Sequence, residues 1–96
     1  MTFRLVLTNS AHEDIQWFRT REQKLIIKAL KTYLVDDADV ESNRRKRLRP
    51  NELAPWELRL GDLRVFYVVK GNTVRVIAVG YKEHNALFIR RTRVEL

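Results

Sequence analysis

The stretch WELRLGDLRVFYVVKGNTVRVIAV, residues 56–79, decides the fold. Polar and apolar residues alternate along it, and the pairs Gly61-Asp62 and Gly71-Asn72 divide it into three runs. A glycine followed by Asp or Asn is typical of a two-residue hairpin turn, because glycine tolerates the positive φ that such a turn requires. The stretch therefore predicts a three-stranded antiparallel meander, with strands over roughly 55–60, 63–70 and 73–80.

Two-residue turns also set the register of the strands. The first turn pairs Leu60 with Leu63, which brings Arg59 directly opposite Arg64. The second turn extends the ladder to the third strand and places Arg64 opposite Val79 on its other side. A slip of one residue would move every side chain of a strand to the other face, so the register predicts which residues share a face.

The predicted register separates two faces of the meander. One face is apolar and must pack on other elements. It holds Trp56, Leu58, Leu60, Leu63, Val65, Tyr67, Val69, Val74, Val76 and Ala78. The other face is mixed and is expected to be open to solvent or to a ligand. It holds Glu57, Arg59, Arg64, Phe66, Val68, Arg75, Ile77 and Val79.

The first half of the chain predicts one strand and two helices. Residues 2–8, TFRLVLT, alternate as a strand does. Two capping boxes follow, Ser10 to Glu13 and Thr20 to Gln23, and each is expected to open a helix. The expected fold is a single α+β domain over 1–96. It has an N-terminal strand, a two-helix hairpin and then the meander, with the helices packed on one face of the sheet.

The net charge of +7 is concentrated in the second half of the chain. Residues 1–43 hold six Lys or Arg and seven Asp or Glu, a balance of −1, whereas residues 44–96 hold thirteen and five, a balance of +8. This asymmetry favours a polyanionic partner. No apolar run approaches a membrane span and the cations do not follow an amphipathic helix, so no membrane association is expected. The absence of cysteine fits a reducing cytoplasm.

Arg59 opposite Arg64 is the most informative pair, because like charges across a strand pair repel by up to roughly 1 kcal/mol. Glu57 lies on the same face, two positions from Arg59, and would relieve that repulsion. Two interpretations follow from this arrangement. The three side chains form a surface charge network, or the two guanidiniums form a site for an anion such as a phosphodiester.

Four ionisable side chains come directly after the last predicted strand: Tyr81, Lys82, Glu83 and His84. They emerge beside Val79, the expected partner of Arg64, and are therefore expected to approach the same anion. They supply the groups for RNA cleavage without a metal, namely a base for the 2′-hydroxyl, an acid for the leaving 5′-oxygen and cations for the phosphoryl oxygens. A histidine in a loop can also be a solvated or capping residue. The catalytic candidates are Arg59, Arg64, Lys82, His84 and Tyr81.

A basic run precedes the meander and holds Arg44, Arg45, Lys46, Arg47 and Arg49. It is interpreted either as a solvated connection or as an RNA-binding rim that contacts phosphates with little sequence preference. Leu48 is expected to anchor the run to the core. No glycine-rich phosphate loop, HExxH motif or Cys/His cluster occurs in the sequence, so neither a cofactor nor a metal is expected.

Three stretches carry a resemblance to a known family: RRKRLRP (44–50), WELRLGDLRVFYVV (56–69) and VIAVGYKEHNALFIR (76–90). In the order strand, helix, helix, three strands, they resemble the RelE/ParE superfamily of toxins from bacterial type II toxin–antitoxin systems over nearly the whole chain. The pattern W-x-L-R-x-G-D-x-R-V-x-Y is the most specific part. The resemblance implies a helical hairpin against a curved antiparallel sheet, and a cognate acidic antitoxin whose extended segment wraps the toxin.

The superfamily contains two main activities. RelE-like members bind the ribosomal A site and cut mRNA with basic residues on the open sheet face and a C-terminal acid or base, whereas ParE-like members inhibit DNA gyrase. By position, the resemblance implies that Arg59, Arg64 and Lys82 act on the RNA phosphate. The chain departs from the RelE-like pattern at Glu57, where a lysine is common, and at Phe88, which replaces a tyrosine.

The departures leave proton transfer to His84, Glu57 or Tyr81. The leading interpretation is a ribosome-dependent, metal-independent mRNA endoribonuclease that inhibits translation. The alternatives are a gyrase inhibitor, which the two departures favour, and a degenerate toxin that only binds its antitoxin. In all three cases an acidic amphipathic antitoxin segment is expected to cover the mixed face and to exclude RNA from it.

Overall fold

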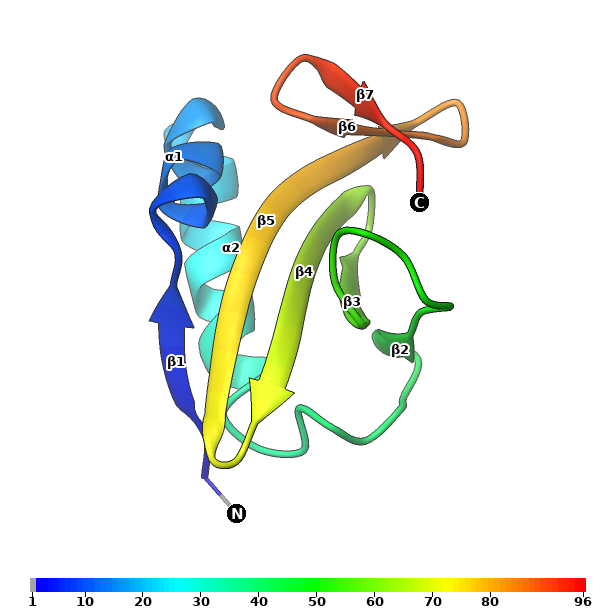
Figure 1. Cartoon of the computed structure of the whole chain (residues 1–96). Coiled ribbons are helices and arrows are strands. Elements are labelled where there is room, and N and C mark those ends of the chain that lie inside the picture. Colours follow the sequence, from blue (N-terminus) through cyan, green and yellow to red (C-terminus); the bar gives the residue numbers. More distant parts are fainter. Residues whose placement is uncertain (1) are drawn as a thin grey trace.

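A computed structural model describes residues 2–96 of the chain as two helices and a seven-stranded sheet (Figure 1). The elements in chain order are β1 (Arg4–Leu7), α1 (Asn9–Trp17), α2 (Thr20–Tyr33), β2 (Arg45–Arg47), β3 (Trp56–Leu60), β4 (Leu63–Lys70), β5 (Thr73–Glu83), β6 (Ala86–Ile89) and β7 (Thr92–Val94). The expected α+β fold with an N-terminal strand and two successive helices is confirmed. No helix within residues 2–96 is long and apolar enough to cross a membrane.

The predicted meander is β3, β4 and β5, and it forms the centre of a larger sheet. The strands follow the order β2-β3-β4-β5-β6-β7 with antiparallel neighbours, and β1 joins the edge of β5 in parallel. The strands β2, β6 and β7 were not predicted, because each is only three or four residues long. Figure 1 shows the β6–β7 hairpin beyond the start of β4, at the far end of the long β5.

The predicted turns and the register of the first hairpin are confirmed. Gly61 and Gly71 have positive φ, 59° and 57°, as two-residue hairpin turns require. Leu60 pairs with Leu63, and Arg59 lies directly opposite Arg64. The turn chemistry therefore determines which charged side chains face one another across β3 and β4.

The predicted register between β4 and β5 is wrong beyond Tyr67, because β5 contains a bulge. Val76 pairs with Tyr67 and Ala78 pairs with Phe66, so Ile77 has no partner on β4. The extra residue reverses the facing of every later β5 side chain. Arg64 consequently lies opposite Gly80 and not opposite Val79.

Ala78 and Val79 exchange faces as a result of the bulge. Val79 was expected on the mixed face but is buried in the main core opposite Val65. Ala78 was expected in the core but packs with Phe66 on the other side of the sheet. The hairpin rules could not predict this exchange, because they assume an uninterrupted ladder.

Both helices begin differently from the predicted capping boxes. α1 is capped by Thr8, whose hydroxyl accepts the N–H of Ala11 at 3.0 Å, so the Ser10 box does not open it. Arg19 is the N-cap residue of α2 and makes no side-chain cap. Gln23 instead donates to the carbonyl of Phe18 at 2.8 Å and so ties the start of α2 to the end of α1.

The main core lies between the helices and one face of the sheet, as predicted. It is formed by Phe3, Ala11, Ile15, Ile26, Ala29, Leu30, Leu34, Ala38, Trp56, Leu58, Val65, Tyr67, Val74, Val76 and Val79. Tyr67 is fully buried, and its hydroxyl donates to the carbonyl of Ala38 at 2.8 Å, which satisfies the one polar atom of the ring.

A second cluster covers part of the face that was expected to be open. Phe66, Ala78, Ala54 and Leu87 are buried there, with five partly buried side chains against them: Leu48, Leu53, Ile77, Ile89 and Val94. The expectation of a solvent-open face is therefore wrong around Phe66, because the segment before β3 and the β6–β7 hairpin pack on it. Leu48 does anchor the basic run, but in this second cluster.

A buried carboxylate fills a gap in the edge of β5. β1 pairs with β5 over 73–76 and β6 pairs with it over 81–83, so neither strand pairs with residues 77–80 on that side. The Asp14 Oδ2 atom accepts the N–H of Val79 at 3.0 Å within this gap. Its Oδ1 atom accepts from Arg90 at 2.8 Å, which ties the β6–β7 turn to α1.

Candidate functional site

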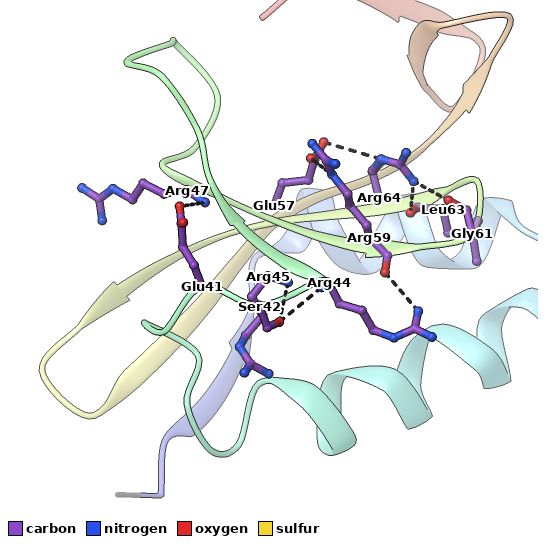
Figure 2. Close-up of polar contacts among 10 residues, drawn as sticks. All are labelled: Glu41, Ser42, Arg44, Arg45, Arg47, Glu57, Arg59, Gly61, Leu63 and Arg64. Carbon is purple, nitrogen blue, oxygen red and sulfur yellow. Dashed lines mark hydrogen bonds and ion pairs between the residues drawn. The ribbon is translucent and has the colours of Figure 1, made fainter.

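The centre of the candidate site is a carboxylate between two guanidiniums (Figure 2). Glu57 Oε2 lies 2.8 Å from Arg59 Nε, and Glu57 Oε1 lies 3.6 Å from Arg64 Nε. The Glu57 side chain is only 4% exposed, whereas those of Arg64 and Arg59 are 15% and 47% exposed. The cross-strand register thus assembles a charged cluster that is closed on the Glu57 side and open on the Arg59 side.

Arg64 is held in place by the turn that precedes it. Its Nη1 group donates to the carbonyls of Gly61 at 2.5 Å and Leu63 at 2.9 Å (Figure 2). Its Nε group is buried and makes no hydrogen bond among the residues that the structure describes. The 3.6 Å ion pair with Glu57 therefore offsets part of the cost of burying this group. An anion that reached Arg64 would therefore meet a guanidinium whose position is already set.

The cluster combines both interpretations of the arginine pair. Glu57 forms the charge network that relieves the repulsion between Arg59 and Arg64. Two guanidiniums and one carboxylate still leave one net positive charge, and Arg59 remains half exposed. The arrangement can therefore hold one anion, in competition with Glu57 for the same donors.

Two lysines share the sheet face of this cluster. Lys46 on β2 lies directly opposite Glu57, and cross-strand partners point to the same side. Lys82 is two residues beyond Gly80, the partner of Arg64, and opposite Leu87 of the second cluster. Lys46, Arg59, Arg64 and Lys82 therefore share one sheet face, with Lys46 opposite Glu57 and Lys82 diagonal to Arg64.

The other two catalytic candidates are not brought to this cluster. Tyr81 faces the helices, where its ring stacks on Trp17 with centroids 5.6 Å apart. The expectation that Tyr81 approaches the anion of Arg64 fails because the bulge reverses its facing. His84 is exposed in the β5–β6 turn, with positive φ of 52°, and makes no side-chain hydrogen bond within residues 2–96.

Phe88, at the position of the missing tyrosine, also faces the helices. It pairs with Tyr81 across β5 and β6, and the two rings stack at 5.4 Å. Its backbone carbonyl lies so close to Gly80 that a Cβ atom at that position would collide with it. Gly80 is therefore required for the close approach of β6 to β5 beside the charged cluster.

The basic run forms an edge strand and not a loop. Arg45 donates to the carbonyls of Val40 at 2.8 Å and Tyr33 at 3.2 Å, so it fastens the end of α2. Arg44 lies over the Tyr33 ring at 5.1 Å and donates to the carbonyl of Arg59 at 3.3 Å (Figure 2). These two arginines are therefore structural contacts as well as surface charge.

The other three residues of the run, Lys46, Arg47 and Arg49, are partly or largely exposed. Arg47 lies over the Trp56 ring at 5.5 Å, and its N–H donates to Glu41 at 3.0 Å (Figure 2). Lys46 and Arg49 have no side-chain hydrogen bond or ion pair among residues 2–96. Lys46, which lies across from Glu57, joins the run to the charged cluster.

Sequence reasoning missed Asp14 and Trp17. Asp14 falls inside the apolar stripe of α1, between Ala11 and Ile15, and a carboxylate in that position signals a buried partner. Trp17 ends the helix and is 39% exposed, and no pattern in the sequence distinguishes it from a core aromatic residue. No group of three or more metal-ligating side chains occurs in the part of the chain that the structure describes.

Among solved structures, the chain is similar to a chain of the toxin–antitoxin complex RelBE2 from Mycobacterium tuberculosis. The TM-score is 0.69 at 17% sequence identity, over 85% of this chain and 100% of that chain. This similarity confirms the RelE-like fold that the sequence resemblance implied. In comparisons by sequence, no family model and no curated protein matches the chain.

Proposed function

We propose that the chain is the toxin of a type II toxin–antitoxin system and that it cleaves mRNA in the ribosome. The observation that carries the proposal is the Arg59–Glu57–Arg64 cluster, flanked by Lys46 and Lys82 on one face of a RelE-like sheet. A phosphodiester is the anion that best suits two arginines with one net charge to spare. The fold similarity to a chain of a toxin–antitoxin complex supports the same assignment.

In this proposal the arginines and Lys82 act on the scissile phosphate. Arg59 is the more exposed and binds the phosphate first, while Arg64, already positioned by its two carbonyl contacts, stabilises the charge that develops on the phosphoryl oxygens. Lys82 approaches from β5. The basic rim of Arg44, Arg45, Lys46, Arg47 and Arg49 adds contacts to ribosomal or message phosphates that carry no sequence information.

In the proposed reaction, the 2′-oxygen of one nucleotide attacks the phosphorus attached to the 3′-oxygen of the same nucleotide. A bond forms between the 2′-oxygen and phosphorus, the bond from phosphorus to the 5′-oxygen breaks, and the products carry a 2′,3′-cyclic phosphate and a 5′-hydroxyl. One group takes the proton of the 2′-hydroxyl and another supplies a proton to the leaving oxygen. Glu57 lies within the cluster and is the first candidate, His84 would have to reach it from the β5–β6 turn, and Tyr81 lies on the opposite face.

The test is cleavage of a defined message on ribosomes, read by primer extension. Cuts near codon boundaries are expected with the wild-type protein, and they should vanish in Arg64→Ala. Arg75→Ala is the matched control, since it removes an exposed arginine from β5 that lies outside the cluster. Intact message with folded wild-type protein would overturn the proposal.

The second candidate is a toxin that acts by binding alone, such as an inhibitor of DNA gyrase. It is favoured by the pairing of Glu57 with both arginines and by the absence of a hydroxyl on Phe88. A supercoiling assay with purified gyrase tests it directly. A protein that inhibits neither growth nor gyrase supercoiling but still binds an antitoxin would be the third alternative, a degenerate toxin.

An acidic antitoxin segment can bind on the helix side of the sheet, opposite the face that carries the charged cluster. A hollow of about 380 Å³ lies between α2 and the β3–β4 hairpin, with Leu25, Leu60 and Leu63 in its wall. Its only charged side chains are Lys28 and Arg44, and Arg44 also contacts the carbonyl of Arg59. We expect an acidic amphipathic segment there to exclude RNA from Arg59, and simultaneous binding of both in a competition assay would contradict this.

A further inference from the structure

An aromatic cavity lies on the helix side of the sheet, behind the charged cluster. It has a volume of about 570 Å³ and is bordered by the end of α1, the start of α2 and the end of β5. Trp17 stacks on Tyr81 with the ring planes 2° apart, and Phe18 meets both rings edge-on. Trp17 remains 39% exposed despite these contacts. The cavity therefore presents a large aromatic surface, held in place by neighbouring rings, to any ligand that enters.

Four charged side chains surround this aromatic surface: Arg19, Glu22, Glu83 and Arg91. Within residues 2–96 none of them forms an ion pair or a side-chain hydrogen bond. Their charges sum to zero, so the cavity does not attract a phosphate as the Arg59 face does. It suits a planar, neutral ligand that carries hydrogen-bond donors and acceptors on its edge.

We propose that this cavity binds an unpaired base of the RNA substrate. The base stacks against Trp17, its carbonyl or ring-nitrogen acceptors take hydrogen bonds from an arginine, and its N–H groups donate to a glutamate. This inference rests on the proposed ribonuclease function, because it assigns to the same RNA a second contact away from the scissile phosphate.

The position of the cavity relative to the charged cluster supports one RNA strand touching both. Leu63 and Tyr81 line the cavity, and the next residues along their strands, Arg64 and Lys82, point to the other face. The β3–β4 hairpin ends there, and the backbone carbonyl of Asp62 accepts the N–H of Lys82 at 2.8 Å. A strand that passes around this turn places a phosphate at Arg64 and a neighbouring base at Trp17.

An acidic peptide is the less suitable occupant. The two charged side chains that line the hollow beside Leu25, Lys28 and Arg44, are both cationic, whereas the lining of the Trp17 cavity has as many carboxylates as guanidiniums. An acidic segment would meet Glu22 and Glu83 without a surplus of positive charge to offset them. The two cavities are therefore assigned to ligands of different chemistry.

The experiment measures binding of a labelled seven-nucleotide RNA by fluorescence anisotropy. The RNA carries 2′-O-methyl groups, so it cannot be cleaved, and a second strand of equal length and charge lacks all its bases. Trp17→Ala should weaken binding of the strand with bases about 5-fold or more, the effect of one lost stacking contact. It should leave binding of the abasic strand unchanged. Quenching of indole fluorescence on titration with the first strand should report Trp17, since Trp56 is buried.

Two control variants separate stacking from folding. Trp17→Phe keeps an aromatic face and should retain most of the affinity. Ile27→Ala removes a similarly exposed apolar side chain, 37% exposed against 39% for Trp17, from α2 outside the cavity and should have no effect. The inference would be overturned if Trp17→Ala weakened binding of both strands equally or of neither strand. It would also be overturned if an acidic peptide, and not RNA, quenched the indole fluorescence. Failure of the wild-type protein to bind either strand would instead count against the proposed function itself.

Discussion

The Asp14 carboxylate accepts the backbone N–H of Val79 at 3.0 Å, in the stretch of β5 that neither β1 nor β6 covers. A side chain here replaces a strand partner. Asp14 is fully buried, and its second oxygen receives Arg90 from the β6–β7 turn. That contact raises the pKa of the Arg90 guanidinium, chiefly through the hydrogen bond to Asp14.

Replacement of Asp14 should therefore destabilise the fold through a specific hydrogen bond. Asp14→Ala leaves the N–H of Val79 buried without a partner, which is expected to cost about 1–3 kcal/mol of unfolding free energy. Asp14→Asn keeps an oxygen for Val79 and should lose clearly less. Urea unfolding measures both, and equal losses would mean that the charge, and not the backbone contact, is what matters.

Neutralising Glu57 should strengthen RNA binding. In Glu57→Gln both guanidiniums are released from their carboxylate, so phosphate affinity at low salt should rise about 5-fold or more, the effect of roughly 1 kcal/mol. Glu52→Gln is the matched control, because it changes the net charge equally at an exposed position outside the cluster. Unchanged affinity in Glu57→Gln would mean that the arginines do not bind phosphate.

The same Glu57 variant also tests the proton-transfer role. If Glu57 takes the proton of the 2′-hydroxyl, cleavage on ribosomes falls while RNA binding rises. If His84 alone handles the proton, cleavage follows binding and His84→Ala abolishes it. A rise in RNA affinity together with a fall in cleavage rate is therefore expected if Glu57 acts as the general base.

A side chain at position 80 should separate β6 from β5. The Cβ of Gly80→Ala would collide with the carbonyl oxygen of Phe88, a backbone atom that cannot rotate away. We expect a loss of about 1–3 kcal/mol in unfolding free energy, together with weaker RNA binding through displaced Lys82. Gly71→Ala meets no nearby atom but is strained by its positive φ, and because its turn lies at the other end of β5 it should leave RNA binding unchanged. A Gly80→Ala protein with wild-type stability and binding would contradict this account.

Tyr67 should make the fold sensitive to high pH. Burial raises the pKa of the Tyr67 phenol above its ordinary value of 10.0, and Arg45 only partly offsets this. Because the folded-state pKa is the higher one, stability is intact below pH about 10. It falls as pH rises above that value, by about 1.4 kcal/mol per pH unit, since only the unfolded chain releases the proton.

Tyr67→Phe should remove this alkaline loss. It leaves the carbonyl of Ala38 without its hydrogen bond and so is less stable than the wild type at neutral pH. The difference between the two proteins should then shrink between pH 10 and 11. A constant difference across that interval, measured by urea unfolding, would show that the phenol does not titrate as proposed.

The parts of the fold that sequence predicts are those with local causes. Gly61 and Gly71 specify their turns, and the first turn alone places Arg59 opposite Arg64. The bulge at Ile77 has no local cause in the alternating pattern. The β4 partners of β5 are therefore predicted wrongly from Ile77 to the end of the strand. The short strands β6 and β7 are stabilised by packing on Phe66 and by Arg90, contacts that no short-range rule contains.

The candidate site divides in the same way. The arginine pair and its carboxylate follow from the hairpin register and are present in the structure. The grouping of Tyr81 with Arg64 depended on the register beyond the bulge and does not occur. The Trp17 cavity is lined by residues from α1, α2 and β5. Residues so far apart along the chain cannot be placed together from their spacing in the sequence alone.

The bulge also has a consequence for how such sheets diverge. If Ile77 instead paired with Phe66 in an uninterrupted ladder, Tyr81 would turn toward the face of Arg64 and Lys82 would turn toward the helices. The presence or absence of one bulge can thus exchange the side chains displayed on the two sides of a sheet without altering any functional residue. Related chains with identical residues after the strand can therefore differ in which of them meets the substrate.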